Sequence, residues 1–241
     1  MFFRKIIRKY QYFKKFRTYD EALKVSNEYI DQYYDEKKEL DLILPENVPT
    51  WERTSILPII MPFLKKKTVI LDYGGGHKPI FSEIKKSTDL LIKTIVIERE
   101  NYCSYIKKKI PIKYKKYLRY YPSLNSIKKK NKIDVVCFNS SIQYLKEYKY
   151  LIKKCKKFNP KYILITRSNF HNEKKDFFSL ETIVKNHYHP HIFFSYKSFL
   201  NFMKKMKYKL IFKNEYNRNR YRHELISGKE FCHMDLIFAK R

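Results

Sequence analysis

The sequence is short of cysteine, of long apolar runs and of glycine, and each shortage excludes a class of protein. Its four cysteines are far apart and form no C-x-x-C pair, so we expect reduced thiols in a cytosolic protein, with neither a disulfide framework nor a structural zinc site. The apolar stretches fall well short of the ~20 residues that a membrane-spanning helix needs. Charged residues interrupt the start of the chain, where a secretory signal would need an apolar core.

Glycine occurs four times in 241 residues, and three of the four are adjacent, at Gly74, Gly75 and Gly76. They follow a short apolar run, residues 68–71, and the acidic residue Asp72. A buried strand that ends in an acid and a glycine-only turn, and then starts a helix, is how a Rossmann-type fold brings its backbone close to a nucleotide. We therefore interpret this turn as the binding site of a nucleotide-like cofactor, with a purely structural turn as the alternative.

Two further residues refine the identity of that cofactor. Lys78 stands where the third small residue of a dinucleotide-binding turn is usual, which favours S-adenosyl-L-methionine, a cofactor without phosphate, over a dinucleotide. Glu98 ends the next apolar run, about 20 residues after the glycines, where a carboxylate accepts both ribose hydroxyls. Glu98 is the expected ribose ligand. Glu100 would take this role if the strand were shifted, and a solvated strand-end acid is the plain alternative.

From residue 68 onward, strand and helix signals alternate. Apolar runs at 69–71, 94–97, 117–121, 133–138 and 162–166 are separated by helical patterns at 80–86, 101–110 and 142–157. This alternation predicts crossover connections and a parallel sheet. A polar segment with several histidines then leads to a helix at 195–206 and to strand-like runs at 208–215 and 231–239. The pattern predicts an α/β, Rossmann-like class I methyltransferase fold, with a mostly parallel seven-stranded sheet and a C-terminal antiparallel hairpin.

The first quarter of the chain reads as helical. Residues 1–17 repeat apolar side chains at helical spacing with basic residues between them, which predicts an amphipathic helix that packs on the domain or lies on an anionic membrane surface. Thr18 and Glu21 form a capping box that starts a second helix, running to about residue 34. Residues 51–64 predict a further helix with proline interruptions. We divide the chain into an N-terminal helical extension, 1–64, and a methyltransferase domain, 65–241.

The net charge of +29 has two interpretations. It suits a polyanionic partner such as nucleic acid, anionic lipid or a phosphate-bearing substrate. However, lysine outnumbers arginine, and Ile, Tyr, Asn and Phe are plentiful, as an AT-rich genome would encode whatever the function. A nucleic-acid site would more often enrich arginine, which binds bases and phosphates bidentately.

Polar residues follow the fourth and fifth apolar runs, where strand ends line the cleft of an open α/β sheet. Ser141 and Ile142 are expected near the adenine or the methionine part of the cofactor, although Ser141 would also serve as a plain helix N-cap. Arg167 comes directly after the fifth run and is expected to point towards the mouth of the cleft. Its guanidinium suits an anionic or hydroxyl-rich acceptor.

These segments resemble those of a known family in the same order. VILDYGGGHKP (69–79), NSSIQYL (139–145), ITRSNF (165–170) and FSY (194–196) are similar to class I S-adenosylmethionine-dependent methyltransferases found in surface-polysaccharide (O-antigen and capsule) biosynthesis clusters. The resemblance runs from about residue 13 to the end. It implies S-adenosylmethionine as cofactor and a sugar or glycan intermediate as acceptor. The chain departs from the family at Ser168 and Asn169, where Thr-Pro is usual, and at Lys197, where proline is usual, so the departures concern the acceptor.

A sugar hydroxyl must lose its proton when it is methylated, so a base near the methyl group is expected. His171, just past the fifth run, and His77, in the glycine turn, are the candidates, and Arg167 completes the predicted catalytic set. The three histidines at 187, 189 and 191 would share one face of an extended segment. They suggest a lid, acceptor contacts or a metal site, but Pro190 and the lack of nearby acids argue against a metal.

The sequence therefore predicts a cytoplasmic methyltransferase for a glycan or small-molecule acceptor, with residues 1–17 offering peripheral attachment to an anionic inner membrane. One alternative is an RNA methyltransferase with a basic surface, although no dedicated nucleic-acid module is evident. The other is a non-catalytic binding protein that has kept the methyltransferase fold.

Overall fold

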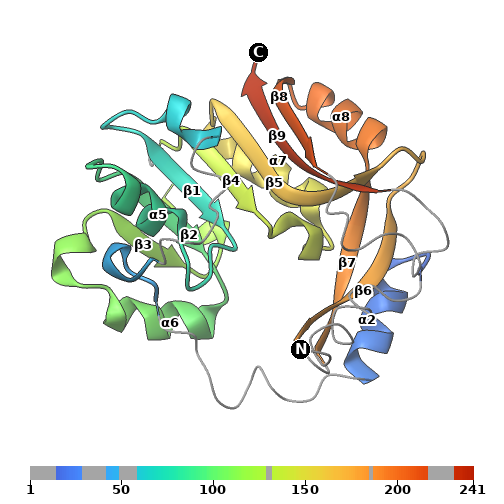
Figure 1. The fold of residues 1–241 in the computed structure, drawn as a ribbon, viewed down its shortest axis with the longest axis horizontal. Coiled ribbons are helices and arrows are strands. Elements are labelled where there is room, and N and C mark those ends of the chain that lie inside the picture. Colours follow the sequence, from blue (N-terminus) through green and yellow to red (C-terminus); the bar gives the residue numbers. More distant parts are fainter. Residues whose placement is uncertain (1–14, 29–41, 49–58, 129–131, 185–186, 217–230) are drawn as a thin grey trace, which may run out of the picture.

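The computed structural model describes residues 15–28, 42–48, 59–128, 132–184, 187–216 and 231–241. Within these ranges one sheet of nine strands runs in the order β3-β2-β1-β4-β5-β7-β6, while β9 pairs with β5 and β8 pairs with β9 (Figure 1). The strands are β1 (Val69–Tyr73), β2 (Lys93–Ile97), β3 (Leu118–Tyr121), β4 (Val135–Asn139), β5 (Tyr162–His171), β6 (Phe177–Val184), β7 (His187–Ser195), β8 (Tyr208–Tyr216) and β9 (Cys232–Lys240). The α-helices are α2 (Tyr19–Glu28), α5 (Ile80–Ser87), α6 (Glu100–Lys109), α7 (Tyr148–Cys155) and α8 (Tyr196–Lys205).

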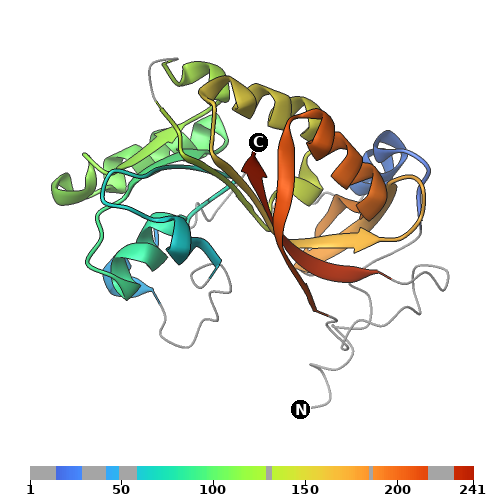
Figure 2. The same ribbon diagram turned by 90° about the horizontal axis from the view of Figure 1, so that it is seen from above.

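Strands β1 to β5 run parallel, as the alternating signals predict. Helices α7 and α8 pack on one face of this sheet and α5 packs on the other (Figure 2). Strands covered on both faces are apolar at nearly every position, which is why these runs are readable in the sequence. Strands β8 and β9 form an antiparallel C-terminal hairpin, and β9 is antiparallel to β5. The predicted mostly parallel sheet with a C-terminal hairpin is confirmed, but β6 and β7, which were not predicted as strands, bring it from the expected seven strands to nine.

The fifth strand is longer than predicted and bends in its middle. Its first half pairs with β4, and its last two residues pair with β7. On its other edge, Thr166 and Arg167 lie opposite the single residue Asp235 of β9, which is a β-bulge. Arg167 has φ of +55° there. Because a bulge bends its strand, the β6–β7 pair extends beyond the carboxyl ends of the parallel strands (Figure 1).

The β6–β7 hairpin replaces what the sequence indicated only as a polar, histidine-bearing segment. Helix α2 packs on this hairpin (Figure 1). The Tyr19 hydroxyl donates to the carbonyl of Tyr144 at 2.9 Å, and Ser26 Oγ donates to the carbonyl of Tyr188 at 2.5 Å. Helix α2 is therefore hydrogen-bonded to two segments that lie more than a hundred residues away in the sequence.

The N-terminal predictions are tested only in part. The N-cap half of the capping box at the start of α2 is present, since the Glu21 N–H donates to Thr18 Oγ1 at 3.1 Å, but the Glu21 carboxylate accepts the N–H of Arg17 at 3.0 Å and not that of Thr18. The amphipathic helix expected at 1–17 lies mostly outside the described residues, and Phe16, which is described, forms an antiparallel bridge with Phe178 instead of a helical turn. The helix expected at 51–64 is described only from residue 59, where a helical turn leads into the 3₁₀ turn η3 (Met61–Phe63). No described helix is long and apolar enough to cross a membrane.

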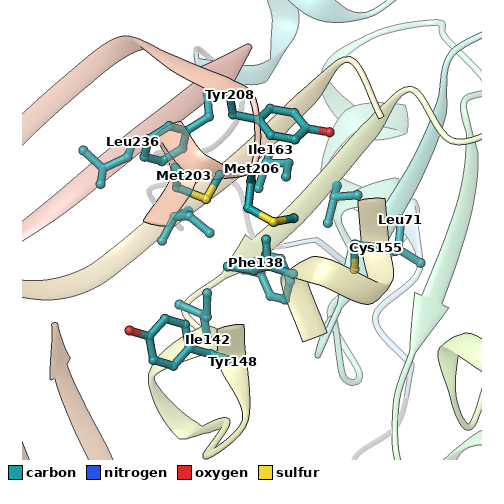
Figure 3. Packing of buried hydrophobic residues seen from close by; sticks show 14 of the residues in the cluster. Leu71, Phe138, Ile142, Tyr148, Cys155, Ile163, Met203, Met206, Tyr208 and Leu236 are labelled. Carbon is teal, nitrogen blue, oxygen red and sulfur yellow. The ribbon is translucent and has the colours of Figure 1, made fainter. Parts of the chain in front are cut away.

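The segment after β4 is not the single helix that its pattern predicts. A 3₁₀ turn, η6 (Ile142–Tyr144), ends at Leu145, whose φ of −103° and ψ of 99° are extended, and α7 begins only at Tyr148. Ile142 is fully buried in the largest core cluster together with Phe138 and Tyr148 (Figure 3). Burial of such a side chain contributes ~1.5–3 kcal/mol, so η6 is held firmly where β4 ends.

Candidate functional site

The glycine turn joins β1 to α5 at the carboxyl end of the central strands. Gly74 and Gly76 have φ of +73° and +53°, a left-handed conformation that other residues rarely adopt. A Cβ atom at Gly75 would lie 2.3 Å from Asp72 Oδ2, and one at Gly74 would lie 2.7 Å from the Cβ of Ser141. The turn therefore needs glycine for its backbone angles at Gly74 and Gly76 and for space at Gly74 and Gly75, and all three glycines are partly exposed.

Hydrogen bonds from neighbouring strands fix this turn. The Gly74 N–H donates to the carbonyl of Ile97, the last residue of β2, at 2.9 Å. The Tyr120 hydroxyl of β3 donates to the carbonyl of Gly76 at 2.8 Å. The two left-handed glycines are thus each held by a different strand, which gives the turn one defined shape.

Asp72 lies buried one residue before the end of β1. Its Oδ2 accepts a hydrogen bond from the N–H of Ile80 at 2.9 Å, whereas its Oδ1 is buried with no hydrogen-bond partner. Burial, reinforced by the negative charges of Glu83 and Glu98, raises the pKa of Asp72 to about 7 in spite of the bond from Ile80. An unpartnered buried carboxylate oxygen is a place that a cationic or N–H group of a ligand would satisfy.

Glu98 directly follows β2 and is half-buried. A Cβ atom at Gly76 would lie 3.9 Å from Glu98 Oε2, so this carboxylate lies beside the glycine turn. Its Oε1 accepts the N–H of Arg99 at 3.0 Å. Glu100, by contrast, is exposed in the first turn of α6. The fold therefore brings Glu98 to the glycine turn, with carboxylate oxygens suited to accept hydroxyl groups.

The residues after β4 brace the glycine turn. Ser141 Oγ donates to the carbonyl of Tyr73 at 2.6 Å. Gln143 Nε2 donates to Oγ of Ser140, which has φ of +55°. Ile142 has no exposed surface and packs in the core beside this turn, and its expected position near the adenine or the methionine part of the cofactor stays a prediction.

Arg167 lies at the bulge of β5, where its backbone N–H donates to the buried Oδ1 of Asp235 at 2.8 Å. Burial lowers the pKa of Lys78 in the glycine turn; Glu83 opposes this shift and the positive charge of Arg167 adds to it. Lys78, in the turn after β1, and Arg167, on β5, thus both lie close enough to Glu83 to interact with it electrostatically. They are suited to an anionic group of a cofactor or an acceptor. Asp235 was missed in the sequence, where its signal is a lone acid inside an apolar run.

The two candidate bases differ in their surroundings. His171 is buried, its Nε2 lies 3.1 Å from the carbonyl of Phe193, and its Nδ1 accepts the N–H of Glu173 at 3.1 Å. Backbone groups therefore occupy both ring nitrogens, and this leaves none for a substrate proton, contrary to the role expected of His171. His77 is half-buried in the glycine turn, and burial lowers its pKa against the opposing charge of Glu98.

The alternating histidines lie on β7, as an extended segment requires. The ring of His189 contacts the ring of Tyr144 edge to face, with centroids 6.3 Å apart. The side chain of His187 lies outside the described residues. In the described part of the chain, no group of three or more His, Cys, Asp or Glu side chains is placed to hold a metal ion.

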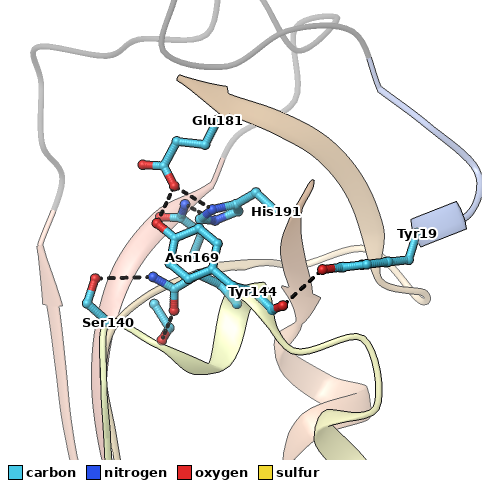
Figure 4. Close-up of polar contacts among 8 residues, drawn as sticks. Tyr19, Ser140, Tyr144, Asn169, Glu181 and His191 are labelled. Atoms are coloured by element: carbon cyan, nitrogen blue, oxygen red, sulfur yellow. Dashed lines mark hydrogen bonds and ion pairs between the residues drawn. The ribbon is translucent and has the colours of Figure 1, made fainter. Parts of the chain in front are cut away.

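A buried polar network connects β5, β6, β7 and η6 (Figure 4). Glu181 Oε2 accepts the hydroxyl of Tyr144 and lies 2.9 Å from Nδ1 of His191. The other ring nitrogen of His191, Nε2, lies 2.8 Å from Nδ2 of Asn169. The sequence contains Tyr144 and Asn169 within the family-like segments 139–145 and 165–170 but gave neither a role, and it gave no signal for Glu181.

Known proteins resemble the chain in structure and not in sequence. No protein-family model matches it, and no curated protein matches it. The 1,6-didemethyltoxoflavin-N1-methyltransferase of Burkholderia thailandensis, with bound 1,6-didemethyltoxoflavin and S-adenosylhomocysteine, is 10% identical with a TM-score of 0.54, and the match covers 93% of this chain and 91% of that one. The glycopeptide N-methyltransferase MtfA, complexed with S-adenosylmethionine, is 9% identical with a TM-score of 0.52, covering 78% and 92%.

A third match, the N-terminal domain of EvdMO1 in the presence of S-adenosylhomocysteine and D-fucose, is 10% identical with a TM-score of 0.53, covering 92% of this chain and 97% of that domain. At these identities the likeness concerns the fold. The strand order, the glycine turn and these structural matches agree: the chain has the Rossmann-like fold of the class I S-adenosylmethionine-dependent methyltransferases.

Proposed function

We propose that the protein is an S-adenosylmethionine-dependent methyltransferase, and that its acceptor is a sugar or glycan intermediate of surface-polysaccharide biosynthesis. One observation carries the cofactor assignment. The partly exposed glycine turn, the unpartnered Asp72 Oδ1 and the carboxylate of Glu98 lie together at the carboxyl ends of β1 and β2. This is the edge of an open α/β sheet at which nucleotide ligands bind.

The chemistry of these groups fits the cofactor part by part. The ammonium of its methionine end would satisfy Asp72 Oδ1, and its ribose hydroxyls would donate to Glu98. Because Gly74 to Gly76 have no side chains, the ligand can approach their backbone closely. The cofactor's carboxylate, or an anionic acceptor, would form ion pairs with Lys78 and Arg167.

When bound, the cofactor supplies a methyl group on a positively charged sulfur. The chain would orient the cofactor, because the turns after β1 and β4 pack on each other and are joined by the hydrogen bond from Ser141 to Tyr73. The acceptor would lie next to the ends of β4 and β5, where Arg167 and the half-buried Tyr144 are placed and where the β6–β7 hairpin begins. The acceptor class is supported by the family resemblance of the sequence. A sugar acceptor is also compatible with the EvdMO1 structure, since that protein was crystallised in the presence of D-fucose.

Calorimetry with S-adenosylhomocysteine tests the proposal on the wild type, on Glu98→Ala and on the neighbouring Glu100→Ala. Loss of charge-assisted hydrogen bonds at Glu98 is expected to weaken binding ~10- to 100-fold, whereas the exposed Glu100 should change it little. Absence of binding to folded wild-type protein would contradict the cofactor assignment. Equal losses in both variants would contradict the assignment of Glu98 as the ribose ligand.

A further inference from the structure

Tyr144, Glu181, His191 and Asn169 form a largely buried network of polar side chains. His191 is 1% exposed and Glu181 is 8% exposed. Burying a carboxylate and an imidazole together is costly unless each is well paired, and such groups concentrate where chemistry is done. The four side chains come from η6, β6, β7 and β5, so the network forms only when the hairpin is folded onto the strand ends.

The geometry defines which nitrogen of His191 carries the proton. An amide nitrogen has no lone pair to offer, so Asn169 Nδ2 donates and His191 Nε2 accepts. Nδ1 lies 2.9 Å from the Glu181 carboxylate and therefore donates to it. His191 is thus the Nδ1–H tautomer, and its basic lone pair is on Nε2. A carboxylate behind Nδ1 is also the partner that stabilises an imidazole when Nε2 takes up a proton.

His171 provides a contrast inside the same fold. Its basic nitrogen, Nδ1, is occupied by the backbone N–H of Glu173, which is fixed by the chain. The basic nitrogen of His191 is occupied instead by a side-chain amide, which has rotatable bonds that a backbone N–H lacks. Of the two buried histidines, His191 is therefore the one whose lone pair a ligand hydroxyl could reach by taking the place of the Asn169 amide.

A short segment of the chain connects the network to the glycine turn, where the cofactor is proposed to bind. Tyr144 lies three residues after Ser141, which is packed against Gly74. Asn169 lies just past the bulge of β5 at Arg167. Tyr144 is half-buried, and its ring packs edge to face on His191 with centroids 5.4 Å apart. Its hydroxyl donates to the same oxygen of Glu181 (Figure 4).

We propose that His191, oriented by Glu181, is the base that takes the proton from a neutral hydroxyl group of the acceptor, so that the reaction is an O-methylation. The inference rests on the proposed methyltransferase function and names its acceptor atom. The acceptor's O–H bond breaks, its proton passes to Nε2, and the oxygen uses the freed electron pair to bond the methyl carbon. The electrons of the broken carbon–sulfur bond stay on sulfur. An alkyl hydroxyl is too weakly acidic to lose its proton to water at neutral pH, which is why it needs such a base.

The charge of the network also selects the acceptor. The carboxylate of Glu181 lies directly behind His191 and repels an acceptor whose reacting end is an anion. A sugar hydroxyl is neutral, and its ring offers C–H groups that pack on an aromatic face such as that of Tyr144. Tyr144 is accordingly a positioning residue, which holds Glu181 through its hydroxyl and presents its ring.

The test uses the full chain with nitrogen-15-labelled histidine and bound S-adenosylhomocysteine, with His191→Gln to assign the resonance. From these contacts His191 is expected as the Nδ1–H tautomer and His171 as the Nε2–H tautomer, which serves as internal reference. Saturating D-fucose, L-rhamnose or D-galactose, used as neutral sugar probes, should move the Nε2 resonance of His191 and leave His171 in place. A cationic or Nε2–H His191, or no movement with any of the three sugars, would overturn the proposal.

Variants give a second measurement. His191→Gln and Glu181→Gln are expected to bind S-adenosylhomocysteine like the wild type but to lower kcat for methyl transfer to the responding sugar ~100-fold or more, with little change in KM. Unchanged kcat in His191→Gln would overturn the base assignment. Failure of S-adenosylhomocysteine to bind the wild type would instead contradict the proposed function itself, so the two failures are distinguishable.

Discussion

Ser141 and Gly74 are in contact across two strand ends. A Cβ atom at Gly74 would lie 2.7 Å from Ser141 Cβ and 3.3 Å from its Oγ. The same hydroxyl donates to the carbonyl of Tyr73 at 2.6 Å. The turn after β4 is thus packed on the turn after β1. A substitution in either turn should therefore displace the other.

Gly74→Ala is therefore expected to be strongly destabilising. The new methyl group meets the buried Ser141, and the left-handed φ of +73° adds strain, so the free energy of unfolding should fall by ~2–4 kcal/mol. Denaturant unfolding measures this loss, and calorimetry should show that S-adenosylhomocysteine no longer binds tightly.

Two further variants separate the clash from the backbone strain. Gly76→Ala has similar strain, with φ of +53°, but its Cβ meets its nearest neighbour only at 3.9 Å, so it should cost only ~1–2 kcal/mol. Adding Ser141→Gly to Gly74→Ala removes the clashing atom and should recover part of the loss. A double variant no more stable than the single one would show that Ser141 is not the obstacle.

Asp72 should make the stability of the protein depend on pH. Its pKa is raised from 3.8 to about 7, mainly by burial. The folded state then holds a proton that the unfolded state has lost, so stability is full below pH ~4 and is lost as the pH rises towards about 7. The loss is on the order of 4 kcal/mol at most.

The comparison with Asp72→Asn isolates this contribution from all other titrations. The asparagine oxygen can still accept the N–H of Ile80, and the variant carries no buried charge. The difference in unfolding free energy, variant minus wild type, should therefore grow between pH ~4 and ~7 and then level off. A difference that stays flat over this range would mean that Asp72 does not titrate as its burial requires.

The central strands and Glu98 could be predicted because their signals are local. A strand covered on both faces is a continuous apolar run, as at β1 and β2. Glu98 follows β2 directly, so it must lie at the carboxyl end of the parallel strands. The N-cap half of the capping box at Thr18 is likewise contained within four residues. In each case the residues that decide the structure are adjacent in the chain.

The network around His191 could not be predicted, because it depends on register. Strand β6 pairs with β7 so that Ser179 lies opposite His191 and Glu181 opposite His189, which makes Glu181 a diagonal neighbour of His191. A shift by one residue would turn these side chains to the opposite face. The bulge that aims β5 at this hairpin depends in turn on Asp235, whose partner Arg167 is 68 residues away.

Arg167→Gly tests the role of the bulge. Glycine accepts φ of +55° without strain but gives the unfolded chain more freedom, so stability should stay within ~1 kcal/mol of the wild type. Removing the positive charge should raise the pKa of Lys78, since Arg167 helps to lower it. Carbon-13 NMR of methylated lysines measures this pKa. Lys207→Gly, at another left-handed and exposed position, should leave Lys78 unchanged.

Cofactor binding should release a proton from Asp72. Near neutral pH a substantial part of the free protein carries this proton, because the pKa is about 7. An ammonium group placed at the unpartnered Oδ1 favours the charged carboxylate and lowers that pKa, so the proton leaves as the ligand binds. Calorimetry of S-adenosylhomocysteine binding at pH ~6 should then give enthalpies that vary linearly with the ionisation enthalpy of the buffer. The slope should vanish in Asp72→Asn, and an equal slope in both proteins would place the ligand's ammonium elsewhere.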